Sequence, residues 1–135
     1  MSSQQRRSTV VRYWWSKAEE SLTSAEREMK AGSLGFAMNR IYYAAFYAVS
    51  AALLERQSSS KKHSGVRTAF HREFTKTGLL DRQWGRFYNE LFEDRHEGDY
   101  IALIEFDLDY VEDQLARCRE FLTHLRSLIT SLARQ

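Results

Sequence analysis

The 135-residue chain contains no proline and a single cysteine, Cys118. Helices tolerate proline poorly, whereas turn-rich β proteins use it often, so its absence favours a helical protein. One cysteine excludes an internal disulfide. No apolar run approaches the roughly 20 residues that a membrane helix requires, and none of signal-peptide length follows the N-terminal arginine pair. We therefore expect a cytoplasmic protein.

An excess of charge is also missing, since the formal net charge is only +2. A polycation that binds nucleic acid through its overall charge is thereby excluded, and local patches would have to supply any such binding. Hydrophobic residues make up 43% and charged residues 28%, which are ordinary values for a globular protein. The length predicts a single domain over residues 1–135, of which about the first eight residues are expected to be flexible.

Apolar residues recur three and four positions apart along most of the chain, which is the periodicity of amphipathic helices. No stretch alternates for long enough to predict a strand. The last predicted helix would span roughly 50 Å, so its end is expected to project or to pack on another chain. The fold class is thus all-α, a four-to-five-helix up-and-down bundle with a long C-terminal helix. The predicted helices cover about residues 8–31, 34–56, 64–76, 81–94 and 100–133.

The helix predicted at 34–56 is apolar on nearly every side and should lie at the centre of the bundle. Arg40 within it has two interpretations. Either its guanidinium reaches a groove edge or a surface carboxylate, or it lines a polar cleft between helices. Tyr43 and its aromatic neighbours are expected in the core, where a buried hydroxyl needs a partner such as Arg40 or an acidic residue.

Glycines and small polar residues mark the predicted helix ends. Gly32 suits a left-handed C-terminal position, and Gly78 ends the third predicted helix. Ser33 and Asp81 suit the N-caps of the helices that follow. Gly85 lies inside the fourth predicted helix, where it costs about 1 kcal/mol relative to alanine.

Two polar segments are candidates for chemistry. "SSSKKHSGVR" gathers Lys61, Lys62 and His63 before a predicted helix start, which suits either a phosphate site or a solvated basic surface. "EDRHEGDY" (93–100) is predicted to break the helices at its glycine. Asp99 there could cap the last helix or take part in catalysis. Because no zinc or metalloprotease spacing is present, no metal is expected.

These pieces together resemble a HEPN domain, of the short stand-alone bacterial and archaeal branch. The resemblance covers nearly the whole chain, and it depends on the order and spacing of several short motifs. Those motifs are "AMNRIYYAAFYAVSAALL" (37–54), "KKHSGV" (61–66), Phe70 and Phe74 before Gly78, and "RHEGDY" (95–100).

The resemblance implies a helical bundle that forms a homodimer with a polar cleft at or near the dimer interface. Many such proteins are metal-independent endoribonuclease toxins without a cofactor, neutralised by a partner that is commonly a minimal nucleotidyltransferase. Their motif is an arginine, four to six residues, and then a histidine. Here Tyr100 stands where histidine is expected after Arg95, in the "RxxxDY" form that is usual in this branch.

Metal-free RNA cleavage requires a group that accepts the 2′-hydroxyl proton and a group that stabilises charge on phosphorus. Arg95 can stabilise that charge through paired contacts with phosphate oxygens. Tyr100 is a poor base because a tyrosine pKa lies near 10, so Asp99 or His63 would have to help. The predicted catalytic residues are Arg95, Asp99 and Tyr100, and the predicted nucleotide- or RNA-binding residues are Arg40, Tyr43, Lys61, Lys62 and His63.

A second hypothesis is a non-catalytic HEPN module that uses the same cleft to hold a nucleotide, an RNA or a nucleotidyltransferase partner. Tyr100 would then be a contact residue or a residue that the partner modifies. A third is a structural helical dimer whose polar groups only cap helices and keep the protein in solution.

Overall fold

Helices make up all the regular structure in the part of the chain that is described. A computed structural model describes the backbone of residues 1–100 and 105–133 and the side chains of residues 1–95 and 105–133. No helix within these ranges is both long and apolar enough to cross a membrane. In chain order the elements are α1 (Ser3–Lys30), α2 (Leu34–Glu55), α3 (His63–Phe70), a π-helical turn η1 (His71–Thr75), α4 (Arg82–Tyr100), α5 (Leu108–Arg126) and α6 (Thr130–Ala133).

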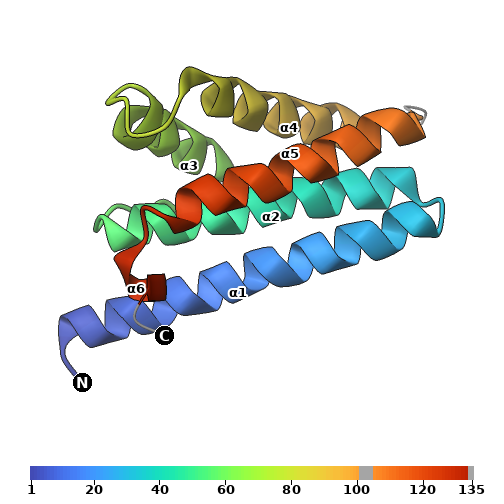
Figure 1. Cartoon of the computed structure of the whole chain (residues 1–135). Helices are drawn as coiled ribbons and strands as arrows, with labels where there is room; N and C mark the ends of the chain where they lie inside the picture. Colours follow the sequence, from blue (N-terminus) through green and yellow to red (C-terminus); the bar gives the residue numbers. More distant parts are fainter. Residues whose placement is uncertain (101–104, 134–135) are drawn as a thin grey trace.

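Helix α2 lies at the centre of the bundle, with α1 along one side and α4 and α5 along the other (Figure 1). Ala44, Ala45 and Ala48 are fully buried. Their small side chains let neighbouring backbones approach closely, which explains how one helix can contact so many others. The all-α fold and the central place of this helix are therefore confirmed.

The predicted helix ends are partly confirmed. Gly32 and Gly78 have φ angles of +81° and +82°, the left-handed conformation that glycine adopts without strain. Asp81 caps α4, because its Oδ1 accepts a hydrogen bond from the Gln83 amide at 2.9 Å. The prediction for Ser33 is wrong in one respect. It stands at the N-cap position of α2, yet its side chain makes no capping hydrogen bond in the described structure.

Helix α1 begins at Ser3, earlier than the apolar pattern predicts. Ser2 and Gln5 form a reciprocal capping box. The Gln5 amide donates to Ser2 Oγ at 3.1 Å, and the Ser2 amide donates to Gln5 Oε1 at 2.7 Å. These capping hydrogen bonds therefore extend α1 toward its N-terminus, beyond the residues whose apolar side chains are buried.

The prediction that "EDRHEGDY" is a helix break is wrong, because α4 continues through Gly98 to Tyr100. Asp99 is therefore part of α4 and not the cap of the last helix, and Asp107 precedes α5 instead. One interior glycine costs about 1 kcal/mol, which is small beside the packing that stabilises most helices in proteins.

The single long C-terminal helix is also wrong. The chain forms α5, turns at residues 127–129, and places the short α6 beside α1 (Figure 1). Helix α6 thus packs back on its own bundle and does not project from it. The periodicity continues across the turn because Ile129 and Leu132 are buried as well.

A carboxylate from α2 holds α6 in place. Glu55 Oε1 accepts hydrogen bonds from the Ser131 amide at 2.6 Å and from Thr130 Oγ1 at 3.2 Å, and Ser131 Oγ lies 3.0 Å from Glu55 Oε2. Burial works to raise the pKa of Glu55, but the hydrogen bonds from Ser131 and Thr130 outweigh it and lower that pKa. The ionised carboxylate is therefore the form that caps α6.

Replacing Glu55 with glutamine is expected to lower the free energy of unfolding at pH 7 by about 1 kcal/mol, a typical value for a lost helix cap. Because the folded-state pKa is depressed, the carboxylate's contribution is fully present above its unfolded value of about 4.3 and is lost as the pH falls through the folded value. Urea unfolding at pH 7 and at pH 3.5 measures this. The exposed Glu112→Gln is the control, and an equal loss for both variants would contradict the assignment.

Gly85 has a structural reason inside α4. A Cβ at this position would lie 3.2 Å from the His71 ring of the π-helical turn. His71 Nε2 is 2.9 Å from Asn89 Oδ1, so the imidazole is held between η1 and α4. The glycine therefore allows these two elements to approach closely, which offsets its low helix propensity.

Cys118 is fully buried in α5, and its Sγ lies 3.7 Å from the Ile41 carbonyl oxygen. Burial raises the pKa of the thiol to about 12. Since the thiolate is the reactive form, we expect negligible reaction with Ellman's reagent at pH 8 in the native protein and one equivalent after unfolding in guanidinium. Rapid native reaction would show that the core opens at this helix.

Candidate functional site

The centre of the candidate site is Arg95, which α4 presents to the tyrosines of α2. Arg95 Nη2 donates a hydrogen bond to the Tyr43 hydroxyl at 3.1 Å. Its Cζ lies 5.3 Å from the ring centroids of both Tyr42 and Tyr43. A cation this close to two aromatic rings is attracted by both of them. The tyrosine pair thus sets the position of the guanidinium.

Tyr42 joins this cluster to His63, the first residue of α3. The Tyr42 hydroxyl oxygen is 2.8 Å from His63 Nδ1. Burial raises the pKa of Tyr42 to about 12, although the positive charge of Arg95 acts in the opposite direction. The hydroxyl is therefore protonated near neutral pH. The His63 ring also stacks on Phe46, with centroids 4.2 Å apart and planes 8° apart.

A polar groove of about 680 Å³ runs between α1 and α2 beside this cluster. Arg40 is exposed at its edge, and Arg40 Nη1 donates to Asn39 Oδ1 at 3.2 Å. Tyr43 lines the same groove and so connects it to Arg95. The groove also contains two further cations, Lys17 and Arg27. Of the two interpretations of Arg40, this position agrees with the second, since the side chain lines a polar groove between two helices.

A second hollow, which we name the aromatic pocket, lies on the other side of His63. It has a volume of about 410 Å³ and is bounded by α1, the end of α2 and the start of α3. Its lining residues are Trp14, Phe46, Ser50, Leu53, Leu54, Ser59, Ser60, Lys61, His63 and Val66.

The structure brings together three of the predicted site residues, Arg95, Tyr43 and His63, around the Tyr42 ring. Lys61 lies beside His63 in the aromatic pocket. Lys62 is exposed and occupies the N-cap position of α3, and Arg40 lies apart in the groove between α1 and α2. The side chains of Asp99 and Tyr100 fall outside the described residues, so their roles stay predictions.

Tyr42 and Trp14 were not singled out by the sequence as site residues. Tyr42 was expected only as a core aromatic, and Arg40 or an acidic residue was expected to satisfy the tyrosine hydroxyls. The partners are instead Arg95 and His63. The signal available in the sequence was the need of buried tyrosine hydroxyls for partners, but it does not say which distant residue provides one.

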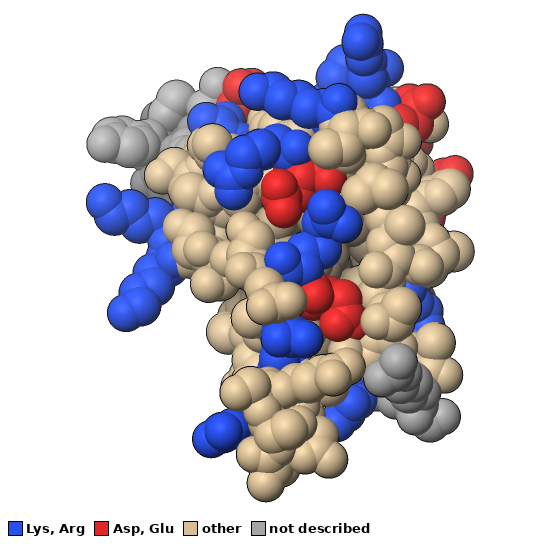
Figure 2. Space-filling view, turned by 90° about the vertical axis from the view of Figure 1, so that its left-hand side faces the viewer, with Lys and Arg blue, Asp and Glu red and all other residues tan. Residues whose placement is uncertain are grey.

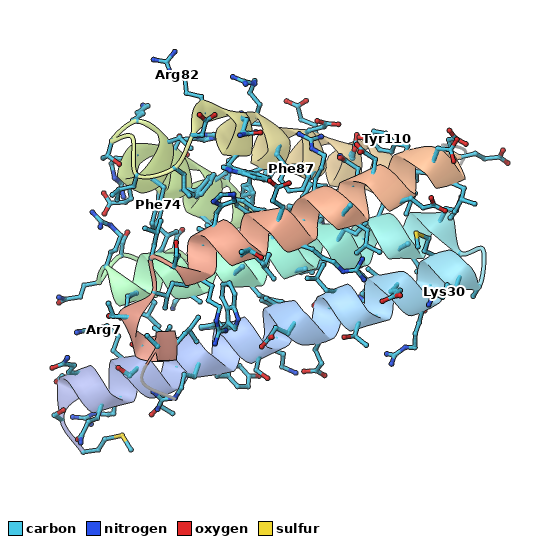
Figure 3. The ribbon with its side chains drawn as sticks, viewed as in Figure 1. Arg7, Lys30, Phe74, Arg82, Phe87 and Tyr110 are labelled. Carbon is cyan, nitrogen blue, oxygen red and sulfur yellow. The ribbon has the colours of Figure 1, made fainter. Side chains whose placement is uncertain are left out.

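A hydrogen-bonded network anchors the segment of α4 that precedes Arg95. The Tyr110 hydroxyl of α5 lies 2.8 Å from Glu90 Oε1 and 2.5 Å from Asp94 Oδ2. Gln114, which is fully buried, donates to Glu90 Oε1 at 3.1 Å. Burial and the two carboxylates raise the pKa of Tyr110 well above its ordinary value, so it remains a donor. Tyr110 lies between α4 and α5 (Figure 3) and fixes one helix on the other.

Positive charge is distributed locally rather than as a large net excess. Figure 2 shows Lys and Arg side chains spread over the end of the bundle that lies at the left in Figure 1, with Asp and Glu side chains between them. Such a surface can attract a polyanion at short range even though the net charge is only +2. Within the described residues, no group of three or more His, Cys, Asp or Glu side chains could hold a metal ion.

Known proteins share this chain's sequence over most of its length. The family model "HEPN domain" matches residues 11–128. A Thermotoga maritima protein named "UPF0332 protein" is 46% identical over 125 residues, which cover 93% of this chain and 95% of that protein. The Methanocaldococcus jannaschii protein named "Putative toxin MJ0142" is 38% identical over 115 residues, which cover 85% of this chain and 78% of that protein.

A second Methanocaldococcus jannaschii protein, named "Putative toxin MJ0605", is 32% identical over 85 residues, or 63% of each chain. The family match includes Tyr43, His63 and Arg95, and it coincides with an all-α bundle built around a central helix. The family model matches most of the chain, and the Thermotoga maritima protein is similar to it over 93% of its length, so the chain belongs to the HEPN domain family.

Proposed function

We propose that this protein is the HEPN component of a prokaryotic toxin–antitoxin-like system and that it cleaves RNA in the cytoplasm without a metal ion. The observation that carries the proposal is the arginine near the end of α4, held against two tyrosines, one of which contacts a histidine. The names of two relatives, "Putative toxin MJ0142" and "Putative toxin MJ0605", support the same class of function.

Arg95 would stabilise the charge that develops on the scissile phosphate. A guanidinium has five N–H donors in a rigid fork that matches phosphate oxygens. Its hydrogen bond to Tyr43 and its place over the Tyr42 ring orient that fork before the RNA arrives. An oriented donor costs no reorganisation during the reaction, which is the main source of electrostatic catalysis.

As the 2′-oxygen attacks phosphorus and the bond from phosphorus to the 5′-oxygen breaks, the 2′-hydroxyl proton would pass to His63 or to Asp99, and the departing 5′-oxygen would take a proton from water. If His63 Nδ1 donates to the Tyr42 oxygen, the neutral imidazole has its acceptor at Nε2 and can act as a general base. Asp99 is four residues after Arg95, a spacing that places two positions on one face of α4. Tyr100 is proposed as the third residue of the site, while Arg40, Lys61 and Lys62 would bind the RNA backbone.

We further propose that the active form is a homodimer with the site at the subunit interface. Each subunit would then contribute one Arg95 to a shared cleft, as the family resemblance implies. Light scattering of the purified protein would give twice the mass of the 15.9 kDa chain.

Incubation with a panel of cellular RNAs in excess EDTA tests the cleavage proposal. Wild-type protein is expected to cut at least one RNA, and Arg95→Ala is expected to leave it intact. If the wild-type protein leaves every RNA whole at high concentration, the ribonuclease proposal fails.

The presence of Tyr100 in place of histidine favours a second candidate function. A HEPN module without nuclease activity would use the same cluster to bind a nucleotide or RNA and to pair with a minimal nucleotidyltransferase. Co-expression with a neighbouring nucleotidyltransferase should then give a stable complex. No complex, together with a melting temperature that nucleotides leave unchanged, would exclude this candidate.

A further inference from the structure

The aromatic pocket has the size and composition of a small-molecule site. Its volume of about 410 Å³ falls within the range of about 300–1,000 Å³ found for ligand pockets. Apolar side chains from α2 and α3 form much of its wall, among them Leu53, Leu54 and Val66. The polar residues Ser59, Ser60 and Lys61 also line the pocket, and we call the side formed by Ser59 and Ser60 the serine wall. Such a mixture suits a ligand with an apolar face and a polar edge.

Aromatic rings from three helices meet at this pocket. Trp14 comes from α1, Phe46 from α2 and His63 from α3. Phe46 and His63 are already stacked in nearly parallel planes, and Trp14 stacks on Tyr47 with centroids 5.5 Å apart. Aromatic side chains that present a ring to a hollow are the usual platforms for nucleobases, because every base has a π face.

Neighbouring residues hold the serine wall of the pocket in place. A Cβ at position 65 would overlap Ser60 Oγ, so only glycine lets Ser60 fold down onto the start of α3. Ser60 Oγ also lies 3.3 Å from the Lys62 amide nitrogen, which donates to it. Gly65 and Lys62 thus hold the segment that closes one side of the pocket.

One cation lines the pocket. Lys61 is exposed there, so its ammonium can reach the phosphate of a nucleotide whose base enters the pocket.

His63 belongs both to the wall of the pocket and to the Arg95 cluster. It lines the pocket, and its Nδ1 lies 2.8 Å from the Tyr42 hydroxyl. Arg95 also contacts Tyr42, with its Cζ 5.3 Å from the tyrosine ring centroid.

We propose that the aromatic pocket is a nucleobase subsite, which holds one base of the bound RNA. That the ligand is RNA rests on the proposed function, but base binding requires no cleavage. The two proposals can therefore be tested separately.

Calorimetric titration with the four nucleoside 5′-monophosphates, and with ribose 5-phosphate as a base-free probe, tests the subsite. At least one nucleotide is expected to bind about tenfold more tightly than ribose 5-phosphate, the contribution of one stacked base. Ser50→Phe, which fills the pocket, and Trp14→Ala, which removes one wall, should each abolish that difference. Phe36→Ala is the control, because Phe36 is 67% exposed and does not line the pocket.

Equal affinity for ribose 5-phosphate and for all four nucleotides would overturn the subsite, as would an equal effect of Trp14→Ala and Phe36→Ala. A change of oligomeric state in Ser50→Phe without a change in nucleotide affinity would also overturn it, in favour of self-association. Circular dichroism melting shows whether each variant is folded.

Gly65→Ala provides a second variant that leaves the aromatic rings unchanged. It should displace Ser60 and weaken nucleotide binding, and unchanged binding would contradict the role of the serine wall. Nucleotide binding that depends on the pocket, in a protein that leaves RNA whole, would support the subsite and defeat the ribonuclease proposal. Cleavage with the same KM in wild type, Ser50→Phe and Trp14→Ala would support the ribonuclease proposal and defeat the subsite.

Discussion

Arg95→Ala is expected to reduce RNA cleavage on the order of 10³-fold while leaving the protein folded. Removal of one preoriented donor to a developing negative charge costs about 10²–10³-fold in well-studied enzymes, and loss of a whole arginine at a phosphoryl centre costs about 10³–10⁵-fold. Arg95 has this position here, because Tyr43 accepts one of its hydrogen bonds and both tyrosine rings lie against it. Single-turnover cleavage in excess EDTA measures the change.

Arg95→Lys separates charge from geometry. Lysine keeps the positive charge but lacks the planar fork that meets two phosphate oxygens at once. We therefore expect only a minor part of the activity to return, with RNA affinity close to that of the wild type. Full activity in this variant would show that charge alone is sufficient at this position.

The matched control for both variants is Arg82→Ala. Arg82 lies at the start of the same helix, forms no ion pair among the described residues and points away from the bundle (Figure 3). Its removal lowers the net charge by the same amount as Arg95→Ala. A similar loss of cleavage in Arg82→Ala would mean that overall charge, and not the α4–α2 cluster, supports the activity.

Phe121→Ala is expected to lower the free energy of unfolding by about 3–5 kcal/mol, the usual cost of truncating a buried phenylalanine. Phe121 of α5 is fully buried, and its ring centroid lies 5.5–5.7 Å from those of three other aromatic residues. These residues belong to α3 and α4, so the ring joins three helices. The neighbours are Phe70, Trp84 and Phe87.

Urea unfolding followed by circular dichroism measures this loss. Because a domain of this kind is stable by about 5–15 kcal/mol in total, the variant should lose a large part of its stability. Phe36→Ala provides the control, since the Phe36 side chain is 67% exposed and its truncation should change stability by no more than about 0.5 kcal/mol. Comparable effects of the two substitutions would contradict the position of Phe121 at the centre of the bundle.

The helices were predictable because their signals are local. The apolar positions of α1 and α2 recur every three or four residues, and Gly32 adopts the left-handed conformation expected of it. Local signals failed where helix boundaries depend on packing. Gly98 reads as a break, yet α4 continues through it, and the unbroken period after Leu108 conceals a turn.

The candidate site was predictable only in part. Arg95, Tyr43 and His63 stood out from residue type and from the order of their motifs. Their mutual arrangement could not be predicted, because Arg95 donates a hydrogen bond to a tyrosine 52 positions away and His63 contacts a tyrosine 21 positions away. Trp14 had no local signal at all, since its part in the aromatic pocket depends on how α1 lies beside the ends of α2 and α3.

The amino-acid sequence by itself determined that the protein is helical, that α2 is the central helix and that the polar residues of interest lie in two short segments. Only the tertiary structure decided that α4 carries Arg95 to Tyr42 and Tyr43, that His63 completes the cluster, and that α6 returns to Glu55. The physical reason is the distance along the chain over which each kind of signal acts. Backbone propensity and amphipathic period are properties of neighbouring residues, whereas a guanidinium, a phenol and an imidazole from three helices meet only after those helices have packed.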